Sequence, residues 1–432
     1  MSKISSIKSI QVLDSRGLPT VACRITLENS LTAGVMIPSG ASTGNKEAIE
    51  LRDNRDEYMG KGVIDAVNNI NEKIKPLLIG IDPSDQKQID TMLIELDGTP
   101  DKSNIGANAI LAASLASCRV AAKDNDMSLH SYFSFLYKEI TGNTVFSSIP
   151  MPMLNILNGG EHANNNIDIQ EFMIIPKAAK NFREAMQWSS EIYWNLKKIL
   201  KKNGHSTAVG DEGGFAPNLK SNEDAIKLIV ESISASKLKP GEDVFLSLDC
   251  ASSEFYKNKK YHLKGEQKIL DSKEFTDYLS NLIDSYPIIS IEDGMDEDDH
   301  EGWDILTKKI GSHCQLVGDD LFVTNKDILL DGINKNLANS ILIKFNQIGS
   351  ITETIQTIDL AIKHEYKSII SHRSGETEDT TISDLAVGLG VGQIKTGAPC
   401  RSDRVAKYNR LLWIEEENSK LSFSKWINYI IW

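Results

Sequence analysis

The hydrophobic pattern of the sequence changes about one third of the way along the chain. Near the start, alternating apolar residues in TVACRITL predict a half-buried strand, and LTAGVM is its candidate hairpin partner. A helical period begins near Lys61, and residues 104–122 form a longer, alanine-rich helical pattern. The apolar face of the first helix is expected to contain Val63, Val67, Ile70, Ile74 and Leu77. These patterns predict an N-terminal α+β domain over residues 1–140, followed by a polar boundary segment.

After that boundary, short apolar runs recur, and each run ends in polar or charged residues. After a longer first interval, the run ends are spaced by roughly 25 residues, and amphipathic helical patterns fill the gaps. This repeat is typical of a (β/α)8 barrel. The runs MPMLNIL and QEFMIIP supply the two remaining strands, so residues 141–432 are predicted to form the barrel. The run ends are Asp249, Glu292–Asp293, Asp319–Asp320, Lys344, Ser371–Arg373 and Lys395.

Composition narrows the class of protein. The chain has 432 residues and a formal net charge of −13, which disfavours non-specific nucleic-acid binding as its main task. Its five cysteines are scattered without a C-x-x-C pair, which predicts reduced thiols and a cytoplasmic protein. We expect neither a signal peptide nor a membrane span. The apolar C-terminal segment 425–432 is expected to dock against the body, with partner binding as the alternative.

Three of the run ends carry carboxylates that a barrel would bring together. Asp249, Glu292 and Asp319 would end three successive strands, and active sites of barrels form at the carboxyl ends of the strands. Carboxylate oxygens with open positions suit Mg²⁺. The alternative for each residue alone is an acidic side chain at the start of an ordinary loop. Because all three residues would end successive strands at the same end of the barrel, together they favour a metal site.

Basic residues follow on the later strands of the same ring. Near a divalent cation, one of Lys344 and Lys395 could act as a base, and the other could screen charge on a substrate. The alternative for Lys344 is a strand-edge lysine that extends to water. Arg373 and Ser374 together suit a phosphate, although a lone arginine is more often a surface residue.

Three loops rich in small residues could close over a substrate, with ordinary turns as the alternative. They are SGASTG (39–44), NGGEHANNN (158–166) and GDEGGFAPN (210–218). The last loop carries Glu212, a carboxylate that its glycines could bring close to a substrate. The first loop lacks the G-K-[ST] ending of a phosphate-binding P-loop.

Taken together, these segments resemble the enolase family, most closely its bacterial branch. The segments SGASTG, NGGEHA, QEFMI, GDEGG, SIEDG, GDDLFVTN, KFNQIG, SHRSGETEDTTI and QIKTGAP occur in the order of that family, and the resemblance covers nearly the whole chain. It implies a hydro-lyase that interconverts 2-phosphoglycerate and phosphoenolpyruvate in glycolysis, with two Mg²⁺ ions during turnover. It also implies that the second barrel strand runs antiparallel, which the pattern alone does not indicate.

The resemblance assigns roles to individual residues. Lys344 matches the general base and Glu212 the general acid, supported by Glu171. Asp249, Glu292 and Asp319 match the ligands of one Mg²⁺, and Ser42 matches a ligand of the second. The matched substrate-site residues are His162, Gln170, Glu171, His372, Arg373, Ser374 and Lys395. Desolvation and nearby positive charge are expected to lower the proton affinity of Lys344.

The sequence is also compatible with other functions. A Schiff-base aldolase also places a lysine at a barrel strand end, but it does not need the carboxylate trio. A relative acting on another acid and a non-enzymatic scaffold are further alternatives. The family implies a homodimer or a larger assembly. It is also associated with RNA-processing assemblies and with cell surfaces reached without a signal peptide, and no sequence feature supports either of these roles.

Overall fold

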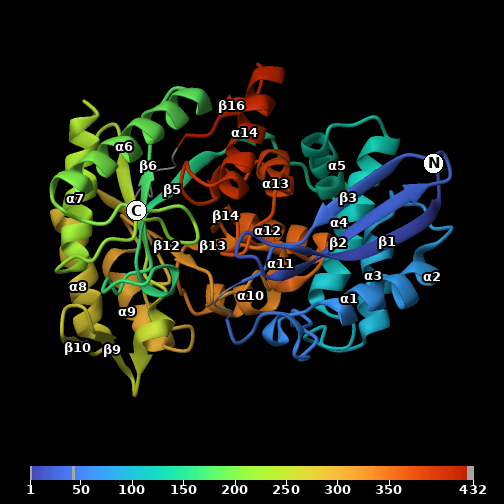
Figure 1. The fold of residues 1–432 in the computed structure, drawn as a ribbon, viewed down its shortest axis with the longest axis horizontal. Helices are drawn as coiled ribbons and strands as arrows, with labels where there is room; N and C mark the ends of the chain where they lie inside the picture. The colour runs from blue at the N-terminus through green and yellow to red at the C-terminus, as the bar shows by residue number, and fades with distance from the viewer. Residues whose placement is uncertain (1, 41–43, 426–432) are drawn as a thin grey trace.

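The computed structural model describes residues 2–40 and 44–425 and arranges them as two parts that lie side by side (Figure 1). A small sheet with its helices, coloured blue to cyan, lies beside a closed eight-stranded barrel. The fold class predicted from the sequence is therefore confirmed: a (β/α)8-type barrel preceded by an α+β part. The division between residues 140 and 141 stays a prediction. The predicted docking of the C-terminal segment falls on residues 426–432, outside the described residues.

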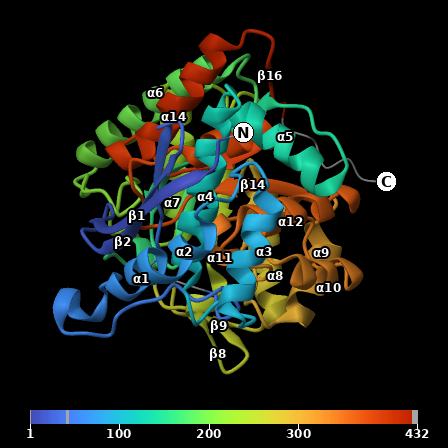
Figure 2. The same cartoon turned by 90° about the vertical axis from the view of Figure 1, so that its right-hand side faces the viewer.

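The N-terminal sheet is antiparallel, with the order β1-β2-β3. Its central strand is the one that the alternating pattern predicts, and its apolar positions are buried. Helix α4 (Ala107–Asp124) packs against the sheet and is buried on nearly every side, as its alanine-rich sequence permits (Figure 2). The strands are β1 (Ile4–Leu13), β2 (Pro19–Leu27) and β3 (Thr32–Met36).

The first predicted helix contains a wider turn, and this changes its buried face. A π-helical segment, η2 (Asn69–Ile74), lies between α1 (Ile64–Asn68) and α2 (Lys75–Leu78). A π turn takes up more residues than an α turn, so after it the buried positions shift by one residue towards the C-terminus. Leu78 is buried, and Leu77, which the regular period places on the face, is only half-buried. The other helices of this part are η1 (Glu57–Gly60), α3 (Gln86–Asp97) and α5 (Leu129–Thr141).

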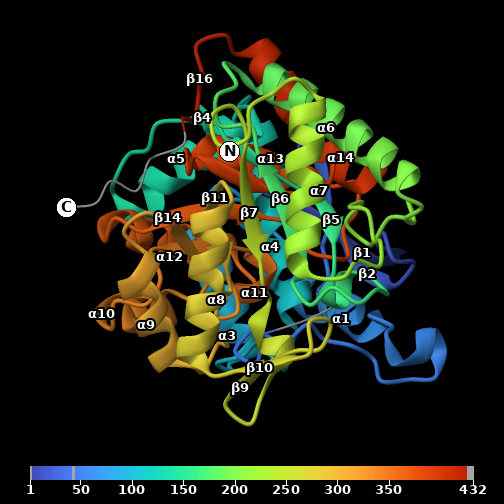
Figure 3. The same cartoon turned by 90° about the vertical axis from the view of Figure 1, so that its left-hand side faces the viewer.

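The barrel closes in the order β5-β6-β7-β11-β12-β13-β14-β15, with β15 paired to β5. Figure 3 shows β6 between β5 and β7. Strand β6 is antiparallel to both of its neighbours, and the remaining neighbours pair in parallel. The antiparallel second strand implied by the resemblance is therefore confirmed. The strands are β5 (Met151–Asn158), β6 (Glu171–Ile175), β7 (Phe245–Asp249), β11 (Ile288–Glu292), β12 (Gln315–Gly318), β13 (Ser340–Ile343), β14 (Lys367–Ser371) and β15 (Gln393–Lys395).

Helices surround the barrel. A small three-stranded sheet accounts for the longer first interval, between the strand ends at Asp249 and Glu292. This sheet of β8 (Tyr256–Lys257), β9 (Lys260–Leu263) and β10 (Lys268–Leu270) lies between β7 and α8. None of the helices in the described part of the chain is long and apolar enough to cross a membrane. The helices are η3 (Gly160–His162), α6 (Phe182–Lys202), α7 (Asn222–Ala235), η4 (Ser252–Phe255), α8 (Ser272–Ser285), α9 (His300–Ile310), α10 (Lys326–Asn334), α11 (Phe345–Ile348), α12 (Ile351–Lys363), α13 (Thr381–Leu389) and α14 (Ser402–Glu417).

The two parts share one hydrophobic core, and the barrel interior has its own. The interior cluster contains Met151, Met153, Met173, Ile175, Val317, Leu342 and Ile369. This packed interior holds the strands in register, so that the residues at their ends are fixed in space. The segment between the two parts continues into β4 (Ser148–Ile149), which pairs in parallel with β16 (Ser422–Phe423). All five cysteines are free, as predicted.

Candidate active site

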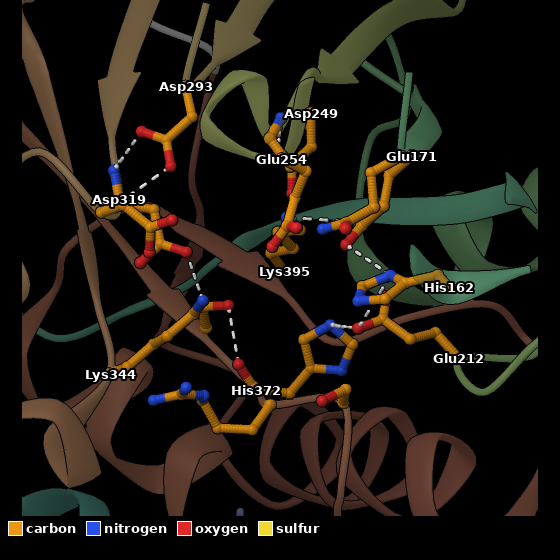
Figure 4. Close-up of a pocket in the computed structure, with 16 residues that line it drawn as sticks. His162, Glu171, Glu212, Asp249, Glu254, Asp293, Asp319, Lys344, His372 and Lys395 are labelled. Atoms are coloured by element: carbon orange, nitrogen blue, oxygen red, sulfur yellow. Dashed lines mark hydrogen bonds and ion pairs between the residues drawn. The ribbon is translucent and has the colours of Figure 1, made fainter. Parts of the chain in front are cut away.

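The predicted strand-end residues meet in one cleft at the end of the barrel, with an empty volume of about 490 Å³ (Figure 4). Glu292 lies behind this lining, in contact with Lys395. Ser42 lies outside the described residues, so its predicted role is not addressed by the structure. The predicted residues that line the cleft are His162, Gln170, Glu171, Glu212, Asp249, Asp319, Lys344, His372, Arg373, Ser374 and Lys395.

Lys395 is the centre of a buried group of carboxylates. Its Nζ atom lies 2.8 Å from Oδ2 of Asp249 and 2.9 Å from both carboxylate oxygens of Glu292. Oε2 of Glu171 is 3.3 Å away. Burial alone would lower the pKa of Lys395, but these carboxylates outweigh it and raise the pKa well above its ordinary value. Lys395 therefore keeps its charge at neutral pH among these carboxylates.

Lys344 follows β13 directly and forms an ion pair with Asp319. Burial alone would lower the pKa of Lys344, but the Asp319 carboxylate outweighs it and raises the pKa. We expected a lowered proton affinity for Lys344, but its contacts within the protein raise it. Gln347 also donates to Asp319, across 2.8 Å, so this carboxylate is held from two sides.

The three predicted metal ligands make different contacts within the protein. Lys395 lies between Asp249 and Glu292, and Asp319 instead lies beside Asp293 and Asp320. Ligand atoms of Asp293, Asp319 and Asp320 lie within 4.8 Å of one another. The Asp293 carboxylate accepts the backbone N–H groups of residues 319 and 320, at 2.9 and 3.0 Å, and so fixes the loop that carries Asp319.

The donor set fits a divalent cation such as Mg²⁺. The oxygen ligands are hard carboxylates, and they are buried near two lysines that do not balance all of their charge. Burial and the neighbouring Asp249 carboxylate raise the pKa of Glu292 well above its ordinary value. Burial and the neighbouring Asp320 raise the pKa of Asp293 in the same way. A cation among these groups would relieve the repulsion that both shifts report.

Glu212 is held by polar groups on the opposite side of the cleft from Lys344 (Figure 4). Oε2 accepts a hydrogen bond from Asn155 across 3.1 Å. Oε1 lies 3.3 Å from Nε2 of His372 and 3.7 Å from Nδ1 of His162. Burial lowers the pKa of His372 to about 3, and it also lowers the pKa of His162, so both rings are neutral at pH 7.

Glu171 lies beside Glu212 and completes this polar group. Burial and the Glu212 carboxylate raise the pKa of Glu171 well above its ordinary value. Two adjacent buried carboxyl groups titrate as a pair and can share one proton. Burial alone would raise the pKa of Glu212, but the neighbouring His372 and His162 outweigh it and lower that pKa well below its ordinary value, so a proton shared by the pair rests on Glu171.

Arg373 points into the cleft after β14, and a residue from the N-terminal part holds it. The Glu47 carboxylate accepts from Nη1 and Nη2 of Arg373, at 2.8 and 3.1 Å. Both side chains are buried. A fork that binds one carboxylate with two N–H groups has the geometry that a phosphate also uses. In the structure this fork binds a carboxylate, and the predicted binding of a phosphate by Arg373 stays a prediction.

Several residues that contact the site were not predicted from the sequence. Asn155 and Gln347 lie within the segments MPMLNIL and KFNQIG but were given no role. Glu47 comes from a segment that was not singled out, and Arg404 lies in the first turn of α14. Asp293 was named with Glu292 at a predicted strand end, but it was given no role. The others carry no local signal, since only the tertiary fold brings them to the cleft.

Comparison with protein families assigns both parts of the chain. The family model described as the enolase N-terminal domain matches residues 4–133. The model described as the enolase C-terminal TIM barrel domain matches residues 146–425. The first match ends inside α5, the second begins just before β4, and the second includes every residue that lines the cleft.

Proposed function

Because the chain belongs to the enolase family and is a lyase of the hydro-lyase type, we propose that it interconverts 2-phosphoglycerate and phosphoenolpyruvate in glycolysis. The observation that carries this proposal is the placement of Lys344 and Glu212 on opposite sides of one cleft (Figure 4). A base and an acid on opposite faces of a substrate suit anti elimination of water. The carboxylate-rich wall and Arg373 between them suit a metal ion and a phosphate.

On the base side, Lys344 would take the proton from carbon 2 of the substrate. The electron pair of that C–H bond moves towards the substrate carboxylate, which already carries charge, so this proton is very weakly acidic. The chemistry that Mg²⁺ supplies when bound is neutralisation of the Asp319 carboxylate and stabilisation of the charge that develops on the substrate. Asp249, Glu292 and Asp319 would hold one Mg²⁺, and Ser42 would contribute to a second.

On the acid side, Glu212 would complete the elimination. The C3–O bond breaks, its electron pair leaves with the oxygen, and a proton from Glu212 makes the leaving group water. The electron pair at carbon 2 then forms the double bond to carbon 3. Glu171 shares the proton with Glu212, and the neutral rings of His162 and His372 orient the carboxyl group without competing for its charge.

The remaining residues would bind and orient the substrate. Arg373 and Ser374 would hold the phosphate, so the phosphate must take the position beside Arg373 that Glu47 shares. Lys395 keeps its charge and would neutralise the substrate carboxylate. Gln170 and His162 line the same wall and would exclude water from the reacting carbons.

Ultraviolet absorbance of phosphoenolpyruvate tests the proposal directly. Purified protein with Mg²⁺ and 2-phosphoglycerate should give rising absorbance, and EDTA should abolish the rise. A flat trace from folded, Mg²⁺-loaded protein would overturn the assignment. From the family we further propose a cytoplasmic homodimer, and sedimentation would distinguish it from a monomer or an octamer.

A further inference from the structure

Arg404 is a buried arginine that lies directly behind the acid side of the cleft. Its side chain is fully buried, and it is not among the residues that line the cleft. A buried guanidinium is costly unless all of its donors are paired. Nε of Arg404 lies 2.7 Å from Oδ2 of Asp403, which balances the charge. The other donors point at groups that carry or adjoin site residues.

One of these donors determines the proton position on His372. Nη1 of Arg404 contacts Nδ1 of His372. A guanidinium has no acceptor, so the N–H must be donated and Nδ1 must be the bare nitrogen of the ring. A neutral ring with bare Nδ1 carries its hydrogen on Nε2, and Nε2 faces Oε1 of Glu212 at 3.3 Å. Arg404 therefore leaves the ring hydrogen of His372 on Nε2, the nitrogen that lies beside the Glu212 carboxylate.

The same guanidinium joins two loops through their backbone. Nη1 also donates to the carbonyl of Arg373, and Nη2 donates to the carbonyl of Ser374. Nη2 lies 3.3 Å from the carbonyl of Asp211, in the loop that carries Glu212. Arg404 thus ties the loop of Glu212 to the turn that carries His372. Without this tie, the two loops could move independently of each other.

The path of the arginine side chain depends on a glycine. Gly397 has φ +81°, and a Cβ there would lie 2.9 Å from Cδ of Arg404 and 2.9 Å from the carbonyl oxygen of Glu212. The backbone carbonyl of Glu212 also accepts from the N–H of Ala398 across 2.9 Å. The loop after β15 therefore presses the Glu212 loop and the arginine together, with no room for a side chain between them.

We propose that Arg404 is a positioning residue for the acid half of the reaction, because it holds His372 as the Nε2–H tautomer that donates to Glu212 and ties the loops of both residues together. This inference rests on the proposed function in one respect, since it takes Glu212 as the acid. It assigns Arg404 no contact with substrate. Lysine cannot replace it, because a single ammonium cannot reach a ring nitrogen and three carbonyls in fixed directions.

The kinetic test separates the acid half from the base half. In Arg404→Lys, we expect kcat for dehydration to fall about tenfold or more, with KM changed by less than about threefold. Exchange of the carbon 2 hydrogen with deuterium from solvent needs Lys344 but not Glu212. The ratio of exchange to phosphoenolpyruvate formation should therefore rise about tenfold. Equal loss of exchange and dehydration would show a merely structural role and overturn the proposal.

Arg401→Lys is the matched control. Arg401 lies in the same segment, is partly buried and also pairs with Asp403, across 3.6 Å, but it donates to the carbonyl of Ser15 and contacts neither His372 nor Glu212. The control should keep the ratio of exchange to dehydration of the unmodified protein. If it shifts that ratio as Arg404→Lys does, the effect belongs to the segment as a whole and the proposal fails.

A spectroscopic test needs no activity. Nitrogen-15 NMR of the ligand-free protein, with His372→Gln used to assign the signal, should show His372 as the neutral Nε2–H tautomer. An Nδ1–H tautomer or a charged ring at pH 7 would overturn the proposal even if the enzyme is active. If the unmodified protein does not dehydrate 2-phosphoglycerate, the proposed function fails, while this measurement still decides the hydrogen-bond direction.

Discussion

Glu212 and Lys344 face the same cleft, but the protein holds them by different means. On the acid side, Glu212 contacts neutral histidines and Asn155, and its environment is complete in the protein itself. On the base side, Lys344 is paired with Asp319 in a group of buried carboxylates. The acid side is thus organised by hydrogen bonds, and the base side by charges that a cation must rebalance. The acid side should depend on geometry, and the base side on metal.

The largest expected effect on this contrast between the two sides comes from removing the base, Lys344. We expect Lys344→Ala to lower kcat at least about 1,000-fold, because no neighbouring group can take the carbon 2 proton. Exchange of that hydrogen with solvent should stop as well, as followed by NMR in deuterium oxide. Lys335→Ala, which removes an exposed lysine paired with Asp331 at 2.6 Å, is the control. Exchange that survives Lys344→Ala would assign the base elsewhere.

Removing the acid should separate the two sides. In Glu212→Gln, we expect dehydration to fall about 100-fold or more, because amide nitrogen cannot deliver the proton that the leaving oxygen needs. Carbon 2 exchange should continue, since Lys344 and its carboxylates are unchanged. Glu242→Gln, at an exposed residue paired with Lys239, controls for the loss of charge. Parallel loss of exchange and dehydration would mean that both sides act as one unit.

The base side could be predicted from the sequence, and much of the acid side could not. Asp249, Glu292, Asp319, Lys344 and Lys395 each follow an apolar run, and the spacing of the runs places them at one end of a barrel. Strand ends are local features, so a pattern along the chain can reveal them. Their detailed pairing was not predictable, because which lysine meets which carboxylate depends on side-chain packing.

The acid side is built from loops and from a strand whose direction the pattern does not encode. Glu171 stands at the start of β6, and only the antiparallel direction of that strand brings it to the cleft. The resemblance to a family implied this direction, whereas alternation of apolar residues is the same either way. Arg404 lies beyond the last barrel strand, and nothing local distinguishes it from other helix arginines.

A third substitution, at Asp293, tests how the base side depends on a metal ion. Asp293 accepts two backbone N–H groups, and asparagine can accept only one of them. In Asp293→Asn, we expect the Mg²⁺ concentration for half activity to rise roughly 10- to 100-fold, because the loop of Asp319 loses its support. Titration of activity with Mg²⁺ measures this, with Asp304→Asn, at a partly exposed residue paired with Lys308, as control. Unchanged Mg²⁺ dependence would show that Asp293 does not position the ligand.

The smallest expected effect concerns the acid side and appears in stability. The pKa of His372 is about 3 in the folded protein and about 6.5 unfolded, so the unfolded chain binds a proton first as pH falls. This contribution to stability is full above pH 6.5 and is lost progressively below it, by about 1 kcal/mol between pH 7 and pH 5.5. His372→Gln cannot titrate, yet its amide can accept from Arg404 and donate to Glu212. Denaturant unfolding should therefore show a shallower loss of stability in the variant across this window. An unchanged slope would mean that His372 is not held neutral, and the acid side would then depend on charge as the base side does.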